Sequence, residues 1–270
     1  MSTAKHNLIT GAGSGLGLGV ATRVLRRGEN VSVLDLAVSD ESRAKLDQAA
    51  TQGKSSWAFF ETNITNDERV HVAVNEAVDQ FGSVDLALNC AGVVLNKTMT
   101  NMSGEEFKRV VDINLNGSFY FAHALIPKLK SGGRLAFIAS LAGFTSNYAY
   151  TAYGASKAGV IALAKTLRYE YGDSDFEISC VCPPEVETPL VYGERAHGDP
   201  IALAIKEVGG CLNADFACDK ILEGLDKGDW LIIPGFQAKL LAKASRFVPE
   251  FFTRYIQRLV RTHRKRLSAS

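Results

Sequence analysis

The sequence has few cysteines, and they are not spaced for a disulfide framework or for a metal site. The five cysteines are an odd number, contain no CxxC pair, and have no histidine at metal-ligand spacing. The five histidines are scattered along the chain, and we expect none of them to form a ligand cluster. We therefore predict no bound metal and a reducing, cytoplasmic environment.

Long hydrophobic runs and an excess of one charge are also missing. The longest stretch without a charged residue, 135–156, is interrupted by serine, threonine, asparagine and tyrosine, so it is a poor membrane span. The N-terminal residues lack the charged and apolar regions of a signal peptide. Thirty lysines and arginines against 29 aspartates and glutamates leave a formal charge of +1, so we expect no nucleic acid partner.

The sequence does contain a regular alternation of short apolar runs with longer stretches of helical periodicity. This alternation is typical of βαβ units around a parallel sheet that is covered on both faces. The expected strands are 6–10, 31–36, 57–61, 85–89, 133–139, 177–182 and 230–233. The expected helices are 15–28, 40–52, 66–81, 103–130, 152–171 and 214–227. We predict one α/β domain over residues 1–235, with a doubly wound parallel sheet of about seven strands and a substrate lid of loop and short helix over 188–213.

A glycine-rich turn follows the first expected strand. Gly11, Gly15 and Gly17 are spaced as GxxxGxG, and a helix follows them. Glycines at such a turn let the backbone approach a pyrophosphate, whose charge meets the free N–H groups at the helix N-terminus. Many α/β proteins have such turns without a nucleotide, so the motif alone leaves both interpretations open.

Asp35 ends the second expected strand and favours a dinucleotide. A carboxylate at this position can accept hydrogen bonds from the adenosine ribose hydroxyls, and it would repel a 2′-phosphate. No arginine or lysine stands beside the glycines or directly after Asp35, where Leu36 follows. We therefore predict NAD as the cofactor, with NADP less favoured. The alternative is that Asp35 simply begins a loop.

Tyr153 and Lys157 are four residues apart in an expected helix, and Ser140 ends the strand before it. On one helix face the ammonium of Lys157 lies beside the phenol of Tyr153. A nearby cation favours the phenolate, so this pair predicts a general acid/base that works near neutral pH. Ser140 would hold the substrate oxygen. On its own, a YxxxK pair is also common as an ordinary surface pair.

Together these motifs resemble the short-chain dehydrogenase/reductase family over about residues 5–235. The resemblance rests on Thr10-Gly11-x-x-x-Gly15-x-Gly17, Asn89-Cys90-Ala91-Gly92, Asn114, Ser140 and Tyr153-x-x-x-Lys157. It implies a Rossmann-like fold in which Tyr153 is the catalytic acid/base and Ser140 polarises the substrate oxygen. Lys157 would lower the tyrosine pKa and hold the nicotinamide ribose, and Asn114 would anchor a water in a proton relay.

The same resemblance implies a set of cofactor-binding residues. Asn89 and its neighbours would line the adenosine side, and Thr188 would contact the nicotinamide amide. The expected set is Gly11, Ser14, Gly15, Leu16, Gly17, Asp35, Leu36, Asn63, Ile64, Asn89, Ala91, Gly92, Tyr153, Lys157, Pro183, Val186 and Thr188. Asn63 replaces the usual aspartate, and its amide oxygen can still accept the adenine bond. Cys90 replaces an asparagine and should fill core, and Pro184 replaces a glycine and should stiffen the cofactor-side lid.

A shorter likeness points to lipid ketones. The segment Pro183-Pro184-x-x-x-Thr188-Pro189, together with Asn-Cys-Ala-Gly, looks like the 3-ketosphinganine reductase branch. That branch reduces lipid ketones with NADPH, whereas Asp35 favours NAD. We therefore keep NAD as the predicted cofactor and a lipid-like substrate as an alternative.

Residues 236–270 form a basic tail. Nine lysines and arginines against Glu250 give it a charge of +8, which leaves −7 for the preceding 235 residues. On both sides of Pro249, a helical interpretation separates a basic face from an apolar face. The basic residues are Lys239, Lys243, Arg246, Arg254, Arg258, Arg261 and Lys265, and the apolar ones are Leu240, Leu241, Phe247, Phe252, Tyr255, Ile256 and Leu259. The apolar face is expected to pack on the domain or on a second subunit. The alternative is contact with an anionic membrane.

We predict an NAD(H)-dependent oxidoreductase that interconverts a hydrophobic secondary alcohol and its ketone. The expected pocket wall is largely apolar and has no arginine or lysine that would clamp a carboxylate or phosphate. Its residues are Val94, Ser140, Ala142, Phe144, Tyr148, Val191 and Tyr192, together with the lid up to Asn213. The alternatives are an NADPH-dependent reductase of a lipid-like ketone at a membrane surface, and a catalytically idle dinucleotide-binding sensor or scaffold. The family resemblance implies a homodimer or homotetramer formed through the helices at 103–130 and 152–171.

Overall fold

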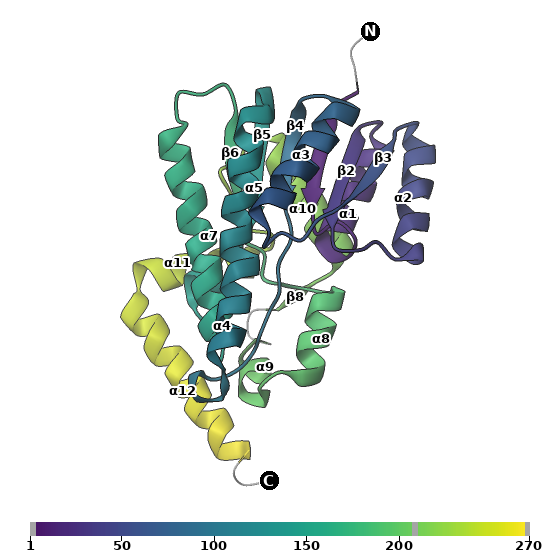
Figure 1. The fold of residues 1–270 in the computed structure, drawn as a ribbon. Helices are drawn as coiled ribbons and strands as arrows, with labels where there is room; N and C mark the ends of the chain where they lie inside the picture. The colour runs from purple at the N-terminus through teal and green to yellow at the C-terminus, as the bar shows by residue number, and fades with distance from the viewer. Residues whose placement is uncertain (1–3, 207–209, 268–270) are drawn as a thin grey trace.

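The computed structural model describes residues 4–206 and 210–267, and within them seven strands form one sheet (Figure 1). The strand order is β3-β2-β1-β4-β5-β6-β9, and each pair of neighbours is parallel. The strands are β1 (His6–Thr10), β2 (Asn30–Asp35), β3 (Trp57–Glu61), β4 (Val84–Asn89), β5 (Leu129–Ile138), β6 (Glu177–Val181) and β9 (Leu231–Ile232). Because the order reverses between β1 and β4, the sheet is doubly wound, as the sequence predicts.

Helices cover both faces of this sheet. One face carries α1, α2 and α10, and the other carries α3, α5 and α7 (Figure 1). Their bounds are α1 Gly15–Arg26, α2 Asp40–Gly53, α3 Asp67–Phe81, α5 Gly117–Leu125, α7 Thr151–Glu170 and α10 Ala214–Asp226. Leu8 of β1 is buried in the core under α3 and α5, and its neighbour Ile9 is buried in the core under α1 and α2. Successive strand residues point to opposite faces, so one apolar run supplies both cores.

The segment predicted as one helix over 103–130 is divided into four shorter elements. They are α4 (Gly104–Val111), the π-helical turn η2 (Asp112–Asn116), α5, and the 3-10 turn η3 (Ile126–Lys128). A capping box between Ser103 and Glu106 begins α4. Pro127 lies in η3 and cannot continue an α-helix, and β5 starts at Leu129 rather than at residue 133. The predicted helix is therefore wrong at its C-terminal end.

Between β6 and α10 the chain forms short elements that include the predicted lid. α8 (Pro189–His197) and α9 (Pro200–Lys206) lie in this lid, and β7 (Glu185–Val186) pairs with β8 (Cys211–Leu212). Residues 207–209 of the lid lie outside the described residues. The sequence pattern does not predict two other short elements, namely η1 (Met99–Asn101) and α6 (Ala142–Thr145).

The basic tail forms two helices that pack on this part of the molecule. α11 (Phe236–Phe247) contacts α6, and α12 (Pro249–Leu267) contacts α9 and α11 (Figure 1). Pro249 is the first residue of α12, a position where proline is tolerated, so the break between the helices falls where the sequence indicates it. A search of the described helices finds none that is both long and apolar enough to cross a membrane.

Candidate active site

A cavity of about 470 Å³ lies at the carboxyl ends of the parallel strands. This is the edge at which open α/β sheets bind ligands. The cavity brings together most of the residues that the sequence predicts for cofactor binding and catalysis. Those that line it are Gly11, Ser14, Gly15, Leu16, Gly17, Asp35, Leu36, Asn63, Ile64, Ala91, Gly92, Ser140, Tyr153, Lys157, Pro183, Val186 and Thr188. Asn89 and Asn114 are not among the residues that line it.

The glycine-rich turn allows a close backbone approach. Gly11 has a φ of +62°, and a Cβ on it would lie 2.8 Å from the backbone nitrogen of Ala91. Gly15 also has a positive φ, of +55°, and a Cβ on Gly17 would lie 2.3 Å from the carbonyl oxygen of Gly11. Larger residues would be strained or would clash at these positions. The first turn of α1 therefore forms part of the cavity wall, where its free N–H groups can meet an anion.

Asp35 ends β2 beside this turn. Its carboxylate accepts hydrogen bonds from the backbone N–H groups of Gly13, at 2.8 Å, and of Leu36, at 2.7 Å. These two bonds fix the carboxylate at the cavity wall, and the oxygens keep further lone pairs for a ligand. A carboxylate held in this way can accept hydrogen bonds from hydroxyl groups, and its charge repels a phosphate.

Asn89 does not line the cavity, although the sequence predicts that it does. Its buried amide oxygen accepts a 2.5 Å hydrogen bond from the Thr10 hydroxyl, and its amide nitrogen donates one of 2.7 Å to Ser118. The Thr10 hydroxyl in turn accepts hydrogen bonds from the backbone N–H groups of Cys90 and Ala91, each at 3.1 Å. Asn89 therefore ties the ends of β1 and β4 to α5. It positions the cavity wall from behind.

Tyr153 and Lys157 lie one turn apart near the start of α7. The Nζ atom of Lys157 lies 5.9 Å from the centre of the Tyr153 ring and donates a 2.8 Å hydrogen bond to the carbonyl oxygen of Ile138. Ser140 lies two residues after the end of β5, and its hydroxyl forms a hydrogen bond with the Tyr153 phenol. The structure therefore brings these three polar side chains together at one point of the cavity.

Burial shifts the pKa values of both Tyr153 and Lys157. Burial raises the pKa of Tyr153 to about 12, and the hydrogen bond with Ser140 lowers it only in part. Burial also lowers the pKa of Lys157 to about 8. Loss of hydration is therefore the main influence on the Tyr153 pKa in the protein alone, and the lowering of this pKa by the ammonium of Lys157 stays a prediction. At neutral pH Tyr153 therefore holds its proton and can donate it.

Asn114 lies in the π-helical turn η2, behind the cavity wall. Its side-chain amide accepts a hydrogen bond from the Val93 N–H at 2.8 Å and donates to the Val93 carbonyl at 2.9 Å and the Ser156 hydroxyl at 3.0 Å. A Cβ on Gly92 would lie 3.2 Å from Asn114 Oδ1 and 3.3 Å from Lys157 Nζ. The amide is thus engaged by protein groups, and Asn114 supports the wall next to Lys157.

A buried charged cluster at the lid end of the cavity was not expected from the sequence. Glu194 of α8 has a side chain that is 3% exposed; it accepts a hydrogen bond from the Tyr150 hydroxyl and pairs with Lys206 of α9 at 2.5 Å. Lys206 Nζ also lies 3.4 Å from a carboxylate oxygen of Glu185. The Tyr150 ring meets the Tyr153 ring edge-on, with centroids 5.1 Å apart. The cluster therefore extends from the lid to Tyr153.

Lys206 lies in the cavity wall as part of this cluster, where it pairs with the carboxylates of Glu185 and Glu194. Tyr150, Glu185, Glu194 and Lys206 all line the cavity. The spacing of Tyr150, one helical turn before Tyr153, is a signal that could have identified it. No periodicity in the lid segment indicates that Glu194 and Lys206 meet. Of the predicted wall, Val94, Ser140, Ala142 and Val191 line the cavity, whereas Phe144, Tyr148 and Tyr192 do not.

The basic tail also forms part of the cavity wall, which the sequence does not predict. The residues that line it are Leu241 of α11 and Phe252, Tyr255 and Ile256 of α12. Phe252 is buried, whereas Leu240 and Phe247 of the predicted apolar face are 58% and 75% exposed. The tail therefore packs on the domain through only part of its apolar face.

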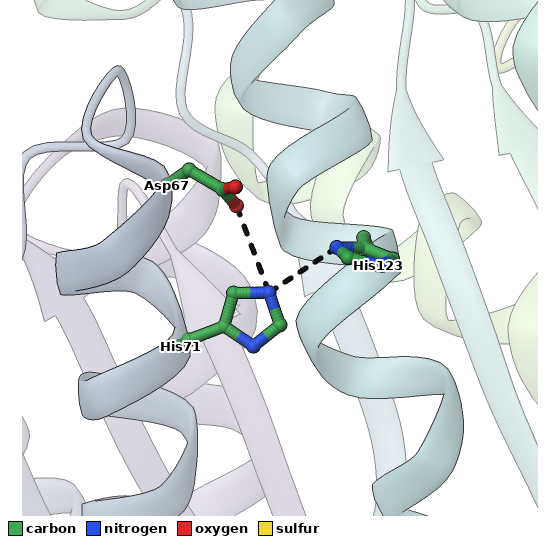
Figure 2. Close-up of side chains that lie close together, drawn as sticks. All are labelled: Asp67, His71 and His123. Atoms are coloured by element: carbon green, nitrogen blue, oxygen red, sulfur yellow. Dashed lines mark hydrogen bonds and ion pairs between the residues drawn. The ribbon is translucent and has the colours of Figure 1, made fainter.

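A group of titratable side chains comes together outside the cavity. His71 and His123 lie 3.2 Å apart, nitrogen to nitrogen, between α3 and α5, and Asp67 lies beside them (Figure 2). Two of the histidines that are scattered along the chain therefore lie side by side in the fold. This arrangement could not be predicted from the sequence, because the two histidines are far apart along the chain and lie on different helices.

Comparison with known proteins identifies the family of this chain and agrees with its fold. Residues 5–198 match the family described as short chain dehydrogenase. Over 246 residues the chain is 30% identical to 3-dehydrosphinganine reductase TSC10B of Arabidopsis thaliana, which covers 89% of this chain and 73% of that protein. Over 190 residues it is 35% identical to cyclohexanol dehydrogenase of Acinetobacter sp. (strain SE19), which covers 69% of this chain and 75% of that protein. A short-chain dehydrogenase/reductase from Burkholderia phymatum, solved in complex with NAD, has a TM-score of 0.78 at 23% identity, covering 93% of this chain and 96% of that one.

The fold and the cavity define a dinucleotide-dependent α/β oxidoreductase. More specifically, the chain belongs to the short-chain dehydrogenase family. It acts on alcohol or ketone groups with a nicotinamide cofactor, NAD or NADP. The structural likeness confirms the Rossmann-like fold that the sequence predicts.

Proposed function

We propose that the protein is an NAD(H)-dependent oxidoreductase that interconverts a hydrophobic secondary alcohol and its ketone. The observation that carries this proposal is the presence of Tyr153, Ser140 and Lys157 in one cavity with the glycine-rich turn and Asp35. The first three side chains can bind an oxygen and transfer a proton to it. The glycine-rich turn and Asp35 can hold a dinucleotide.

Tyr153 is the proposed acid/base. Because its pKa is about 12, it holds a proton at neutral pH and can donate that proton to a ketone oxygen. Ser140 hydrogen-bonds the same oxygen and orients the carbonyl group. In the opposite direction Tyr153 first loses its proton to solvent, and the phenolate, which the ammonium of Lys157 stabilises, then accepts the proton of the alcohol. The nicotinamide, when bound, exchanges the hydride with the substrate carbon.

The same cavity has places for each part of the cofactor. The turn from Gly11 to Gly17 would hold the pyrophosphate, and Asn63 with Ile64 would line the adenine side. Thr188, which is buried at the start of α8, would contact the nicotinamide amide. Asp35 supports NAD over NADP, because its carboxylate would accept the ribose hydroxyls and repel a 2′-phosphate.

A paired titration of NADH and NADPH tests the cofactor proposal. We expect the wild-type chain to bind NADH more tightly than NADPH. Asp35→Ala should weaken NADH binding and bring the affinities for NADH and NADPH closer together. Asp173→Ala is the matched control, because Asp173 lies exposed in a surface turn. Tighter binding of NADPH by the wild-type chain would contradict the proposal.

Substitution of the proposed acid/base tests the catalytic part. Tyr153→Phe should reduce alcohol oxidation and ketone reduction by about 100-fold or more, with NADH binding unchanged. Tyr192→Phe, at a 56% exposed tyrosine outside the cavity, should keep wild-type turnover. Equal turnover by Tyr153→Phe and the wild-type chain would contradict this role, and NADH binding without turnover in all three proteins would favour a catalytically idle dinucleotide-binding module.

A second candidate is an NADPH-dependent reductase of a lipid-like ketone at a membrane surface. The observation that favours it is the tail, whose apolar residues line the cavity while its basic residues Lys243, Arg254 and Arg258 are exposed. A relative named as a 3-dehydrosphinganine reductase agrees with a lipid-like substrate. Rates with NADH and NADPH on ketones of short and long chain length separate the two candidates. A combined preference for NADPH and long chains would select the second.

We further propose that the chain forms a homodimer or homotetramer through α4, α5 and α7. Phe107 of α4 is 39% exposed and Tyr169 of α7 is 71% exposed, which supports contact of these helices with a second copy. Light scattering tests this: a monomer at micromolar concentration would contradict it. Phe107→Glu should dissociate the assembly, whereas Phe236→Glu, at an exposed site in the tail, should not.

A further inference from the structure

Three potential metal ligands converge between two helices, away from the cavity. Asp67 and His71 are separated by one turn of α3, so they share a helix face, and His123 comes from α5. The Nε2 atom of His71 lies 3.2 Å from Nδ1 of His123 and 3.6 Å from a carboxylate oxygen of Asp67 (Figure 2). The three ligand atoms all lie within 4.8 Å of one another.

Hydrogen bonds alone satisfy this arrangement poorly. In Figure 2 the same ring nitrogen of His71 faces both Asp67 and His123. That nitrogen carries at most one hydrogen, so it can donate to only one of the two groups. The remaining group then has only solvent as a partner, since the side chains of His71 and Asp67 are 40% and 49% exposed. A cation placed between the three atoms would be bound by all of them.

We propose that Asp67, His71 and His123 form a binding site for a divalent transition metal, with Zn²⁺ as the ion. In a tetrahedral zinc site, bonds of about 2.0–2.2 Å place ligand atoms about 3.3–3.5 Å apart. The two distances from His71 Nε2, 3.2 and 3.6 Å, are close to this range, and the third, between Asp67 and His123, is at most 4.8 Å, so the exposed Asp67 side chain has to turn toward His123 to complete the site. Two imidazoles and one carboxylate suit zinc better than magnesium or calcium, which prefer oxygen ligands.

The surroundings favour an exchangeable ion that links two helices. In the single chain His71 is half-buried and Asp67 and His123 are exposed, so a fourth position is open to water wherever a second copy leaves this side of α5 uncovered. The Phe119 ring stacks on the His123 ring at 5.7 Å and 8° and limits its rotation. α3 and α5 pack on the same face of the sheet. The metal would therefore stabilise the folded chain without taking part in hydride transfer.

The test titrates Zn²⁺ alone into the full-length, untagged chain after removal of metals, in competition with a chromophoric chelator. We expect one equivalent to bind and the thermal unfolding midpoint to rise with Zn²⁺ concentration. His71→Ala and His123→Ala should each weaken binding by about tenfold or more, since even changes to outer-shell partners of a metal cost about 10–100-fold. Both variants should also lose the Zn²⁺-dependent rise of the unfolding midpoint.

Two control variants identify the site. His197→Ala removes an exposed histidine elsewhere, and Cys211→Ser removes the exposed cysteine. Both should bind Zn²⁺ as the wild-type chain does. NADH binding by every variant reports separately on the fold and on the proposed cofactor site. No binding by the wild-type chain, equal binding by His123→Ala, or loss of binding in Cys211→Ser would each overturn the proposal.

Discussion

At the scale of single residues, burial decides the acid–base properties of Tyr153 and Lys157. The sequence places the two side chains on one helix face, and the structure agrees. The neighbouring ammonium suggests a lowered tyrosine pKa, whereas burial raises the pKa of Tyr153 to about 12 and lowers that of Lys157 to about 8. Spacing along a helix shows which charges are near each other, but the loss of hydration depends on everything packed around them. The pairing could therefore be predicted from the sequence, and the pKa values could not.

Lys157 should make the stability of the protein depend on pH. Its pKa is about 8 in the folded chain against 10.5 for an ordinary lysine, so between these values the unfolded chain binds more protons. The contribution of Lys157 to the free energy of unfolding therefore rises with pH across this range, by up to about 3 kcal/mol. Lys157→Met removes the charge at similar length. In urea unfolding at pH 7.5, Lys157→Met should have a larger free energy of unfolding than the wild type. This difference should be smaller at pH 9.5.

Other buried groups also titrate in alkaline solution. Burial raises the pKa of the Cys218 thiol to about 11, for example, so the stability of either protein alone does not isolate Lys157. Comparing the two proteins at each pH cancels this contribution. A difference between them that stays constant with pH would contradict the assignment of the shift to Lys157.

Glu194 should stabilise the lid end of the cavity. Glu194→Ala removes the carboxylate that binds the Tyr150 hydroxyl and Lys206, and it leaves Lys206 with the more distant Glu185. Loss of the partner of a buried charge costs about 3 kcal/mol. We expect urea unfolding to show a loss of that order and KM for the ketone to rise more than KM for NADH. Glu187→Ala, at an exposed neighbour of the same type, should change neither; equal stability of both variants would contradict this role.

Asp35 and Asn89 show why only part of the site could be predicted from one sequence. Asp35 ends a strand and follows a glycine turn at a fixed spacing, so local pattern is enough to find it. Asn89 has the expected position in its motif, but its amide bonds to Thr10 and Ser118 instead of reaching the cavity. Which way a side chain turns at the end of a strand depends on neighbours that are distant in sequence.

At the scale of helices and strands, the apolar pattern predicts the centres of elements better than their ends. β1 and β3 have the predicted bounds, because polar residues and turns flank short apolar runs there. The bounds of the elements after α5 are harder to predict, because an apolar helix is followed directly by Pro127 and then by β5. The short helices α8 and α9 have little periodicity of their own and are held by tertiary contacts, such as the pair between Glu194 and Lys206.

α12 should determine how well a long apolar substrate binds. Phe252, Tyr255 and Ile256 form the part of the cavity wall that the tail's second helix contributes. Removing residues 249–270 should raise KM for long-chain ketones by about tenfold or more. Leaving two methylene groups of the substrate exposed to water already costs about 1.6 kcal/mol of binding free energy. KM for short ketones and NADH binding should stay unchanged, since other elements form those parts of the site.

A point variant keeps this prediction testable if the truncated chain folds poorly. Ile256→Ala should show a smaller effect in the same direction, and Gln257→Ala, at the exposed neighbouring residue, should show none. Equal KM values for long-chain ketones in the wild type, the truncated chain and Ile256→Ala would contradict a role for α12 in the substrate site.

At the scale of the whole molecule, the near-neutral net charge hides a strong asymmetry. The tail carries +8 and the preceding residues carry −7. The structure places the tail's helices against the lid and the cavity, so the positive charge is concentrated beside the substrate side of the molecule. The count itself is visible in the sequence. Its position next to the cavity follows only from the fold, because nothing in the tail's own pattern indicates where it packs.

This asymmetry predicts attachment to anionic lipid through α11 and α12. Exposed Arg254 and Arg258 lie on α12 together with the 73% exposed side chain of Phe251, which can enter the headgroup region.

Each basic residue near an anionic surface contributes about 1 kcal/mol of binding free energy. Reversing both charges with Arg254→Glu and Arg258→Glu should therefore weaken binding to phosphatidylserine-containing liposomes by about tenfold or more. Arg26→Glu with Lys54→Glu makes the same charge change at exposed sites at the end of α1 and after α2, and it should have little effect. Sedimentation with liposomes at low and high salt measures this, and binding should fall with salt because screening weakens the attraction. If neither the wild-type chain nor the control double variant binds anionic liposomes, or if both double variants bind equally well, the membrane-surface candidate fails and the exposed basic face is simply solvated.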